Sequence, residues 1–165
     1  MKPLIQTPDS EVSPAFSPDG RWLAYTSGRS GRPEVYVQPY PGLDRLVQVS
    51  TNGGLAPAWA RDGRELLYLG RRGMTAVEMK ISGGNIVPGK PVELFRERGI
   101  SIDPVRFDMN PVRFYDVTPD GQRFVIVYRD EPEADEDPVI KHHGQMVNVV
   151  LNWSEELKSL VPTGE

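Results

Sequence analysis

The sequence predicts an all-β fold: a partial β-propeller of about three four-stranded antiparallel blades, with a short C-terminal helix. Two observations predict it. The stretch SPAFSPDGRWLAYTS at residues 13–27 returns in altered form at residues 56–70 and again at residues 115–128. The Asp-Gly pairs inside these copies lie 43 and then 58 residues apart. A strand-rich period of about 40 to 45 residues is typical of propeller blades.

Each copy reads as a β-hairpin closed by an Asp-Gly turn. In Ser17-Pro18-Asp19-Gly20 the proline presets φ for the second position of a type I turn, the aspartate tolerates the third, and the glycine takes the left-handed conformation. Thr118-Pro119-Asp120-Gly121 repeats this pattern, and Ala60-Arg61-Asp62-Gly63 lacks only the proline. Asp19, Asp62 and Asp120 are therefore interpreted as turn residues and not as a carboxylate site.

The strands that follow these turns are apolar on both faces. In the first copy Trp22 and Ala24 alternate with Leu23 and Tyr25, and residues 124–128 of the third copy are apolar throughout. A strand of an ordinary sandwich shows one polar face, whereas two apolar faces indicate a sheet that is covered on both sides, as in stacked blades. Three unrelated hairpins in a β-sandwich remain the alternative.

The predicted elements form one domain of residues 1–162, with blades at about 13–50, 56–95 and 114–153. Leu4-Ile5-Gln6 resembles Val47-Gln48-Val49, and both are expected to be outermost strands that hand over to the next blade. Ser154 is expected to cap a short helix at residues 155–160. The remaining expected strands are 14–16, 22–27, 34–38 and 46–50 in the first blade, 57–59, 65–69, 75–81 and 92–95 in the second, and 115–117, 123–128 and 147–151 in the third, which has no obvious fourth strand.

Three blades leave two apolar faces uncovered, which is an aggregation risk, and full propellers have four to eight blades. Two arrangements resolve this. The favoured one is that the chain forms the C-terminal part of a larger propeller. In the other, two chains close a six-bladed ring, and each lends residues 4–7 to the third blade of its partner. A dimer in solution distinguishes the second arrangement.

Composition excludes several classes of function. The formal charge of −4 argues against nucleic-acid binding, and without cysteine no disulfide or thiolate metal site is available. No run approaches the roughly 18 apolar residues of a membrane helix, so we expect no membrane insertion by this chain. The start, MKPLIQTPDSE, lacks the apolar core of a signal peptide. The protein is therefore either cytoplasmic or a piece of a longer exported or anchored chain.

The first repeat also resembles a known group. PAFSPDGRWLAYTS followed by GRPEVYVQPYPG resembles the TolB-type β-propeller repeat, a WD-like bacterial repeat, and the resemblance extends over about residues 2–162. The ending VVLNWSEELKSLVP is similar to the close of propellers fused behind membrane-anchored bacterial Ser/Thr kinase domains. The resemblance implies a periplasmic or extracytoplasmic sensor or scaffold that binds a protein or peptide. It also implies an alternative, the substrate-gating propeller of a prolyl-peptidase-like hydrolase whose catalytic domain lies outside this chain.

One rim of the predicted propeller is rich in arginine. Arginine suits bidentate capture of carboxylate or phosphate, so we expect this rim to bind a protein partner, an acidic peptide or another anionic ligand. Solvated loop charges are the alternative interpretation. The candidate binding residues are Arg29, Arg32, Arg71, Arg72, Arg106 and Arg113, and Arg96, Arg98 and Arg129 fall in the same loops.

No pattern in the sequence points to catalysis, a cofactor or a metal. The two histidines, His142 and His143, both lie beside the acidic run DEPEADED at residues 130–137. Adjacent histidines do not share a strand face, and their spacing matches no ligand motif, so a solvated loop is the preferred interpretation of this segment. The chain has no G-x-S-x-G elbow and no kinase motif, and we expect no enzymatic activity from it.

Overall fold

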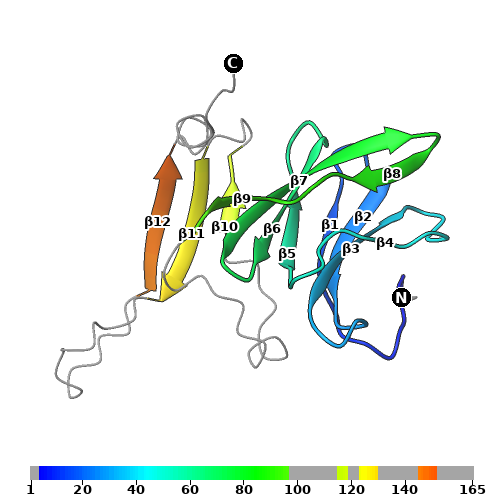
Figure 1. Ribbon diagram of the computed structural model, residues 1–165, viewed down its shortest axis with the longest axis horizontal. Helices are drawn as coiled ribbons and strands as arrows, with labels where there is room; N and C mark the ends of the chain where they lie inside the picture. The colour runs from blue at the N-terminus through cyan, green and yellow to red at the C-terminus, as the bar shows by residue number, and fades with distance from the viewer. Residues whose placement is uncertain (1–3, 97–114, 119–122, 130–144, 152–165) are drawn as a thin grey trace.

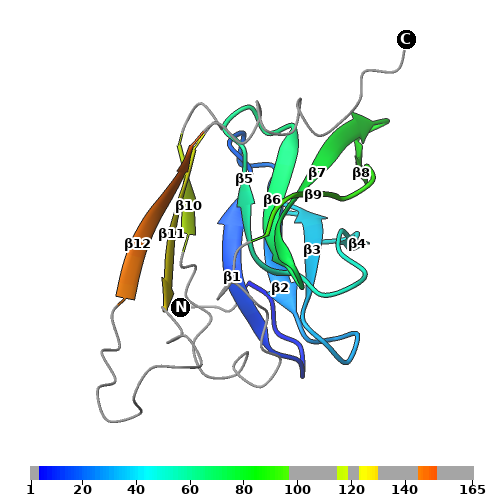
Figure 2. The same cartoon turned by 60° about the vertical axis from the view of Figure 1, so that its left-hand side comes forward.

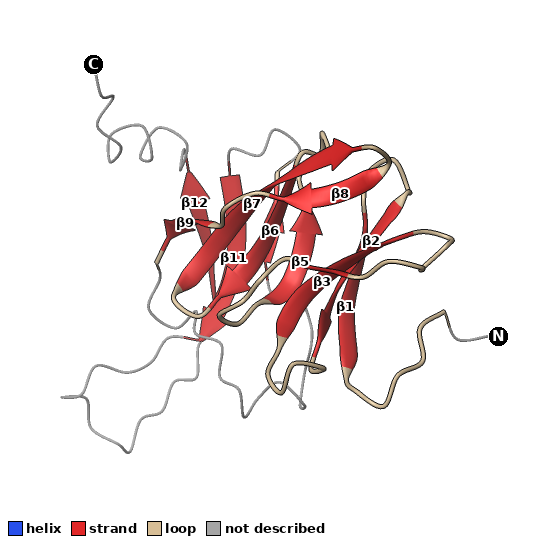
Figure 3. Ribbon diagram, turned by 45° about the vertical axis from the view of Figure 1, so that its right-hand side comes forward, coloured by secondary structure: helices blue, strands red, loops and turns tan. Residues whose placement is uncertain are grey.

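The computed structural model describes residues 4–96, 115–118, 123–129 and 145–151, and every regular element among them is a β-strand (Figures 1 and 3). The strands form three antiparallel sheets in chain order, which confirms the all-β, propeller-like prediction for these residues. The helix expected at 155–160, the turn around Asp120 and the loop at 130–144 lie outside the described residues.

The first sheet matches the first predicted blade. It has the order β1 (Glu11–Phe16), β2 (Trp22–Ser27), β3 (Glu34–Pro39) and β4 (Val47–Gln48). β1 begins earlier than expected because a bulge continues the strand past a residue with positive φ: Ser13 has φ 53°, and the register shifts between Val12 and Ala15. The fourth strand is shorter than predicted.

The second sheet contains β5 (Leu55–Trp59), β6 (Glu65–Gly70), β7 (Gly73–Ser82), β8 (Asn85–Pro88) and β9 (Val92–Phe95). β7 is long enough to serve two partners, since its first half pairs with β9 and its last four residues pair with β8. Gly83 and Gly84, with φ of 57° and 76°, form the two-residue turn between β7 and β8. This hairpin was not predicted.

The third sheet has the order β10 (Tyr115–Val117), β11 (Arg123–Arg129) and β12 (Gln145–Leu151) among the described residues. These are the three strands that the third repeat predicts. Their register aligns Ile126 with Tyr115 on one side and with Asn148 on the other.

The Asp-Gly turns have the hydrogen bonds expected of turn residues. Asp19 Oδ1 accepts hydrogen bonds from the Ser17 hydroxyl at 2.6 Å and from the Arg21 amide at 3.1 Å. The Ser17 hydroxyl and the Arg21 amide, with the Arg21 guanidinium nearby, lower the pKa of Asp19 to about 2. In the second copy Asp62 Oδ1 accepts from the Arg64 amide at 3.0 Å. These aspartates therefore stabilise the hairpins, as the sequence predicts.

The three sheets pack face to face, with the second in the middle (Figure 1), and Figure 2 shows the third sheet standing beside the other two. Buried residues of the first and second sheets form one core cluster, and buried residues of the second and third form another. Trp59 Nε1 donates to the Ala15 carbonyl at 3.2 Å across the first interface. The Tyr115 hydroxyl donates to the carbonyls of Ala56 and Leu67 across the second. This packing confirms, for the strands of the middle sheet, that both faces are covered by neighbouring sheets.

Residues 4–7 are not a strand, so that prediction is wrong for the single chain. Ile5 instead packs against Leu23, Tyr25 and Tyr36 of the first sheet. The physical reason is that, among the described residues, no further sheet stands on this side to offer residues 4–7 an edge.

Candidate functional site: the arginine rim

The rim that collects the candidate arginines is formed by equivalent ends of two neighbouring sheets. Arg29 and Arg32 lie in the loop between β2 and β3, and Arg71 and Arg72 form the two-residue turn between β6 and β7. These two connections occupy the same place in successive sheets, so both open on the same end of the stack. Arg106 and Arg113 lie outside the described residues.

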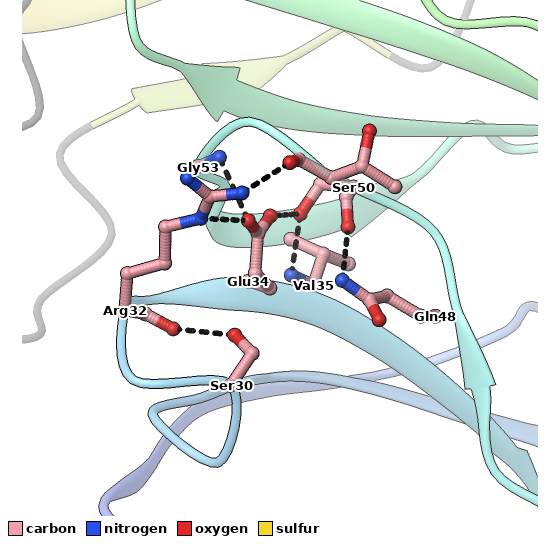
Figure 4. A network of polar contacts seen from close by, with 8 residues as sticks. Ser30, Arg32, Glu34, Val35, Gln48, Ser50 and Gly53 are labelled. Carbon is pink, nitrogen blue, oxygen red and sulfur yellow. Dashed lines mark hydrogen bonds and ion pairs between the residues drawn. The ribbon is translucent and has the colours of Figure 1, made fainter.

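Arg32 is held by a buried carboxylate (Figure 4). Its Nε lies 2.7 Å from Glu34 Oε1, and its Nη2 donates to the Thr51 carbonyl at 2.5 Å. The Glu34 side chain is 0% exposed, whereas that of Arg32 is 54% exposed. No hydrogen bond from Arg32 Nη1 is recorded within the described residues. Arg32 therefore has a fixed guanidinium with one edge open to the surroundings.

The Glu34 carboxylate also orders the connection between β4 and β5. The Ser50 hydroxyl donates to Glu34 Oε2, and the Gly53 amide donates to Oε1 at 3.0 Å. Ser50 Oγ in turn accepts from the Val35 amide at 2.8 Å. Each carboxylate oxygen thus has at least one donor, which is what a buried charge requires. The rim around Arg32 is consequently rigid at residues 50–53.

Gly54 is required beside this network. A Cβ at residue 54 would lie 2.5 Å from Ser50 Oγ and 3.0 Å from Val35 Cγ2. Any larger residue would displace the hydroxyl that satisfies Glu34. Ser50 and Gly54 of this connection are therefore explained by the needs of one buried carboxylate.

Arg29 is exposed, and its guanidinium lies over an aromatic ring. Its Cζ is 5.7 Å from the centroid of the Tyr36 ring, within the range of a cation–π contact. Its backbone amide donates to Ser27 Oγ at 3.2 Å. Among the described residues Arg29 has no carboxylate partner.

Arg71 and Arg72, which are adjacent in one turn, differ in their ion pairing. Arg72 Nε lies 3.4 Å from Glu93 Oε2, and Arg96 Nε also pairs with Glu93. Such exposed ion pairs contribute about 0 to 1 kcal/mol and exchange readily with a competing anion. Within the part of the chain that the structure describes, Arg71 is exposed and has no ion pair.

Acidic groups also lie at this rim, so its charge is mixed. Glu11 begins β1 opposite Ser27, and its Oε1 accepts from Thr7 Oγ1 at 2.7 Å and from Ser27 Oγ at 3.1 Å. Burial first, and then the Glu11 charge, raise the pKa of Tyr25 to about 12. Of the four predicted arginines that the structure describes, Arg32 and Arg72 have carboxylate partners, whereas Arg29 and Arg71 have none among the described residues.

The described residues contain no group of three or more acidic, histidine or cysteine side chains that could hold a metal ion. Among the same residues no helix is long and apolar enough to span a membrane.

Comparison with known proteins finds similarity to TolB. The chain is 42% identical over 48 residues to the Tol-Pal system protein TolB of Desulfosudis oleivorans, and 42% identical over 52 residues to that of Pseudomonas aeruginosa. It is 38% identical over 74 residues to that of Alcanivorax borkumensis. The matched segments make up 29%, 32% and 42% of this chain but only 11%, 12% and 17% of the relatives. No family model matches the chain.

Solved structures with the same fold are also much longer than this chain. A putative TolB from Agrobacterium tumefaciens superposes with a TM-score of 0.54 at 15% identity, over 90% of this chain and 47% of that protein. An oligogalacturonate lyase from Vibrio parahaemolyticus superposes with a TM-score of 0.52 at 12% identity, over 88% of this chain and 39% of that protein. The chain thus has the β-propeller type of fold seen in these structures, is similar in sequence to part of TolB, and spans less than half of either structure. The similarity of its ending to kinase-fused propellers stays a prediction.

Proposed function

We propose that this chain is a non-catalytic interaction module, with a sensor or scaffold role, that binds a protein or peptide partner through the arginine rim. The partner would present carboxylates or another anion to the guanidinium groups of Arg29 and Arg71 and to the open edge of Arg32. The observation that carries the proposal is the fixed position of Arg32. A guanidinium held by Glu34 and Thr51 loses little conformational entropy when an anion binds to its free edge.

The TolB relatives support a protein partner only by analogy, because the chain matches a small part of each. The alternative role, gating a hydrolase domain outside this chain, rests on the family resemblance alone. We therefore take the rim as the part of the proposal to test.

The test measures binding of a fluorescein-labelled oligoglutamate peptide by anisotropy, with the unmodified chain and a double variant, Arg29→Glu with Arg71→Glu. Both side chains are exposed and free of carboxylate partners among the described residues, so the variant should fold normally. We expect affinity to fall by about tenfold or more, because two attractive charges become repulsive. Higher salt should weaken the binding that the unmodified chain shows.

The matched control reverses two arginines at the opposite end of the second sheet, Arg61→Glu with Arg64→Glu. Both are exposed and flank the Asp62-Gly63 turn. This variant has the same net charge as the rim variant, so it should bind the peptide as the unmodified chain does. Equal losses in the two variants would mean that net charge, and not the rim, attracts the peptide.

A further inference from the structure

The three sheets present equivalent residues on one face, which we call the front face. It consists of Phe16, Leu23 and Tyr25 in the first sheet, Trp59, Leu66 and Tyr68 in the second, and Val117, Phe124 and Ile126 in the third. The pairing establishes the equivalence, because Phe16 pairs with Leu23, Trp59 with Leu66, and Val117 with Phe124. The opposite side of each sheet is its back face.

In two of the three sheets the front face packs on the back face of the sheet before it. Leu66 and Tyr68 are buried in one cluster with Trp22 and Val35. Phe124 and Ile126 are buried in one cluster with residues of the second sheet. The front face of the first sheet has no such neighbour among the described residues. Phe16 is accordingly 50% exposed, whereas its equivalent Trp59 is 9% exposed.

Besides the front face of the first sheet, which lacks a neighbouring sheet, residues 4–7 lack a pairing strand among the described residues. A constant offset of 43 residues aligns them with residues 47–50, and it also aligns Ser13 with Ala56, which share a positive φ of 53° and 51°. Residues 47–48 form β4, the fourth strand of the first sheet. The equivalent residues 4–7 precede β1 in the same way but pair with no strand. Leu4 is half exposed.

The third sheet offers the matching edge. Its described strands end at β12, which corresponds to β3 of the first sheet and has no strand on its outer side among the described residues. The register shows the correspondence. Ile126 pairs with Asn148 in the third sheet as Tyr25 pairs with Tyr36 in the first. In the same way, Val125 pairs with Val149 as Ala24 pairs with Val37. In the first sheet β4 pairs with Tyr36 and Val37. The equivalent places on β12 are Asn148 and Val149.

We propose that two copies of this chain close a ring head to tail. The front face of the first sheet of one copy packs on the back face of the third sheet of the other, and residues 4–7 add to the edge of β12 in that other copy. Leu4 lies opposite Val149 and Ile5 opposite Asn148, as Val47 and Gln48 lie opposite Val37 and Tyr36 within one chain.

The contact repeats the front-to-back packing already present twice within the chain, so it needs no new kind of interface. A front-to-back contact joins two different surfaces, and it forms a closed assembly only if the rotation closes. The described residues form three sheets, whereas full propellers have four to eight blades, and two copies together would supply six. In the single chain Ile5 covers part of the front face, so closure exchanges this contact for the partner sheet. The inference does not depend on what the arginine rim binds.

The first test is the mass of the 165-residue chain in solution, measured by size-exclusion chromatography with light scattering over a concentration series. We expect twice the chain mass of 18.5 kDa. Phe16→Glu should give the single-chain mass, because it places a charge in the contact at a side chain that is exposed in one copy. Ile81→Glu is the control, since Ile81 is 52% exposed on the second sheet and should leave the pair intact. Circular dichroism checks that both variants are folded.

A single-chain mass for the unmodified protein would overturn the proposal and assign the front face to a preceding blade of a longer chain. A pair that survives Phe16→Glu would also overturn it, because another surface would then join the copies. Assemblies larger than two copies would exclude the proposed ring of two copies.

The second test addresses the exchanged strand. The chain contains no cysteine, so Leu4→Cys combined with Val149→Cys gives the only thiols. Oxidation should produce a cross-linked dimer on a non-reducing gel that reductant reverses. The control pair, Leu4→Cys with Ile81→Cys, should remain uncross-linked. Equal cross-linking in both pairs, or none in either, would contradict the proposed register.

Discussion

At the scale of single residues, Glu34 determines how the rim is built. It is fully buried, yet it stands at the start of β3 beside exposed loop residues. Its hydrogen-bond partners are Arg32, two residues before it, and Ser50 and Gly53, which lie 16 and 19 residues later in the chain. Burial of a carboxylate is tolerated here because a guanidinium, a hydroxyl and an amide compensate for the lost water.

We predict that Glu34→Ala lowers the free energy of unfolding by about 3 kcal/mol, because it leaves the Ser50 hydroxyl and Gly53 amide without an acceptor and removes the charge partner of Arg32. Urea denaturation measures the change. Glu78→Ala is the matched control, since the Glu78 side chain is 58% exposed and its one ion pair among the described residues is with Lys80, at 3.2 Å. That variant should stay within about 0.5 kcal/mol of the unmodified chain. Equal effects would mean that the Glu34 network does not stabilise the fold.

The candidate arginines could be predicted from sequence because strand order assigns each loop to a rim. The sequence does not predict which of these arginines form ion pairs with carboxylates of the same chain. Glu34 appears in the sequence as an ordinary strand residue, and its burial depends on where residues 50–53 return. Glu93 likewise meets Arg72 only because β9 pairs with the start of β7.

At the scale of elements, turn chemistry explains both what could be predicted and what was missed. The Asp-Gly turns predicted the β1–β2 and β5–β6 hairpins, because their sequence restricts the backbone conformation locally. The same rule applies to Gly83-Gly84, a two-residue glycine turn, but residues 75–81 are predicted only as the third strand of the second blade, with no hairpin after them. Residues 4–7 were predicted as a strand from their sequence, and pairing decided otherwise, since an edge strand exists only where another strand accepts it.

Glycines at two turns of β7 should differ in their tolerance of substitution. At Gly73, φ is 155° and a Cβ would lie 2.0 Å from the Phe95 carbonyl oxygen. At Gly83, φ is 57° and a Cβ would meet nothing within 4 Å. We predict that Gly73→Ala costs about 3 kcal/mol or more, from backbone strain and overpacking together, and that Gly83→Ala costs about 1 kcal/mol from strain alone. Thermal and urea unfolding of the two variants measure the difference, and a smaller cost at Gly73 would mean that β9 does not pack closely on this turn.

At the scale of the whole molecule, the chain is a stack of repeated sheets whose interfaces are built alike. Its architecture could be predicted because each repeat strand carries apolar residues on both sides, which only a stack can bury. The hydrogen bonds between sheets could not be predicted, because they join groups far apart in sequence. Trp59 reaches Ala15, and Tyr115 reaches Ala56 and Leu67.

Removal of one bond between sheets tests whether the second and third sheets unfold together. We predict that Tyr115→Phe lowers the free energy of unfolding by about 1 kcal/mol, because it removes the buried hydroxyl that bonds the Ala56 carbonyl and also lies near the Leu67 carbonyl. The chain has a third tryptophan, Trp153, so the comparison is made in a Trp153→Phe background, where tryptophan fluorescence reports Trp22 and Trp59 in the first two sheets. Far-ultraviolet circular dichroism reports strands in all three. If the sheets form one cooperative unit, both signals should shift by the same amount.

Tyr40→Phe is the matched control for this variant. Tyr40 is exposed, and its ring contact with Phe16, at 4.9 Å between centroids, does not need the hydroxyl. It should leave unfolding unchanged within about 0.5 kcal/mol. A shift of the circular dichroism signal alone in Tyr115→Phe would show that the third sheet unfolds separately.

The β7–β8 hairpin has a practical consequence. β7 starts at the arginine rim with Gly73 and runs to Ser82, so the Gly83-Gly84 tip lies at the far end of the second sheet from that rim. Open space surrounds the Cβ positions of both glycines. Exposed tips of small residues are the sites where chains best accept insertions. A short epitope or dye-accepting tag placed between these glycines would immobilise the protein on a sensor chip in one orientation, with the arginines facing the flowing analyte.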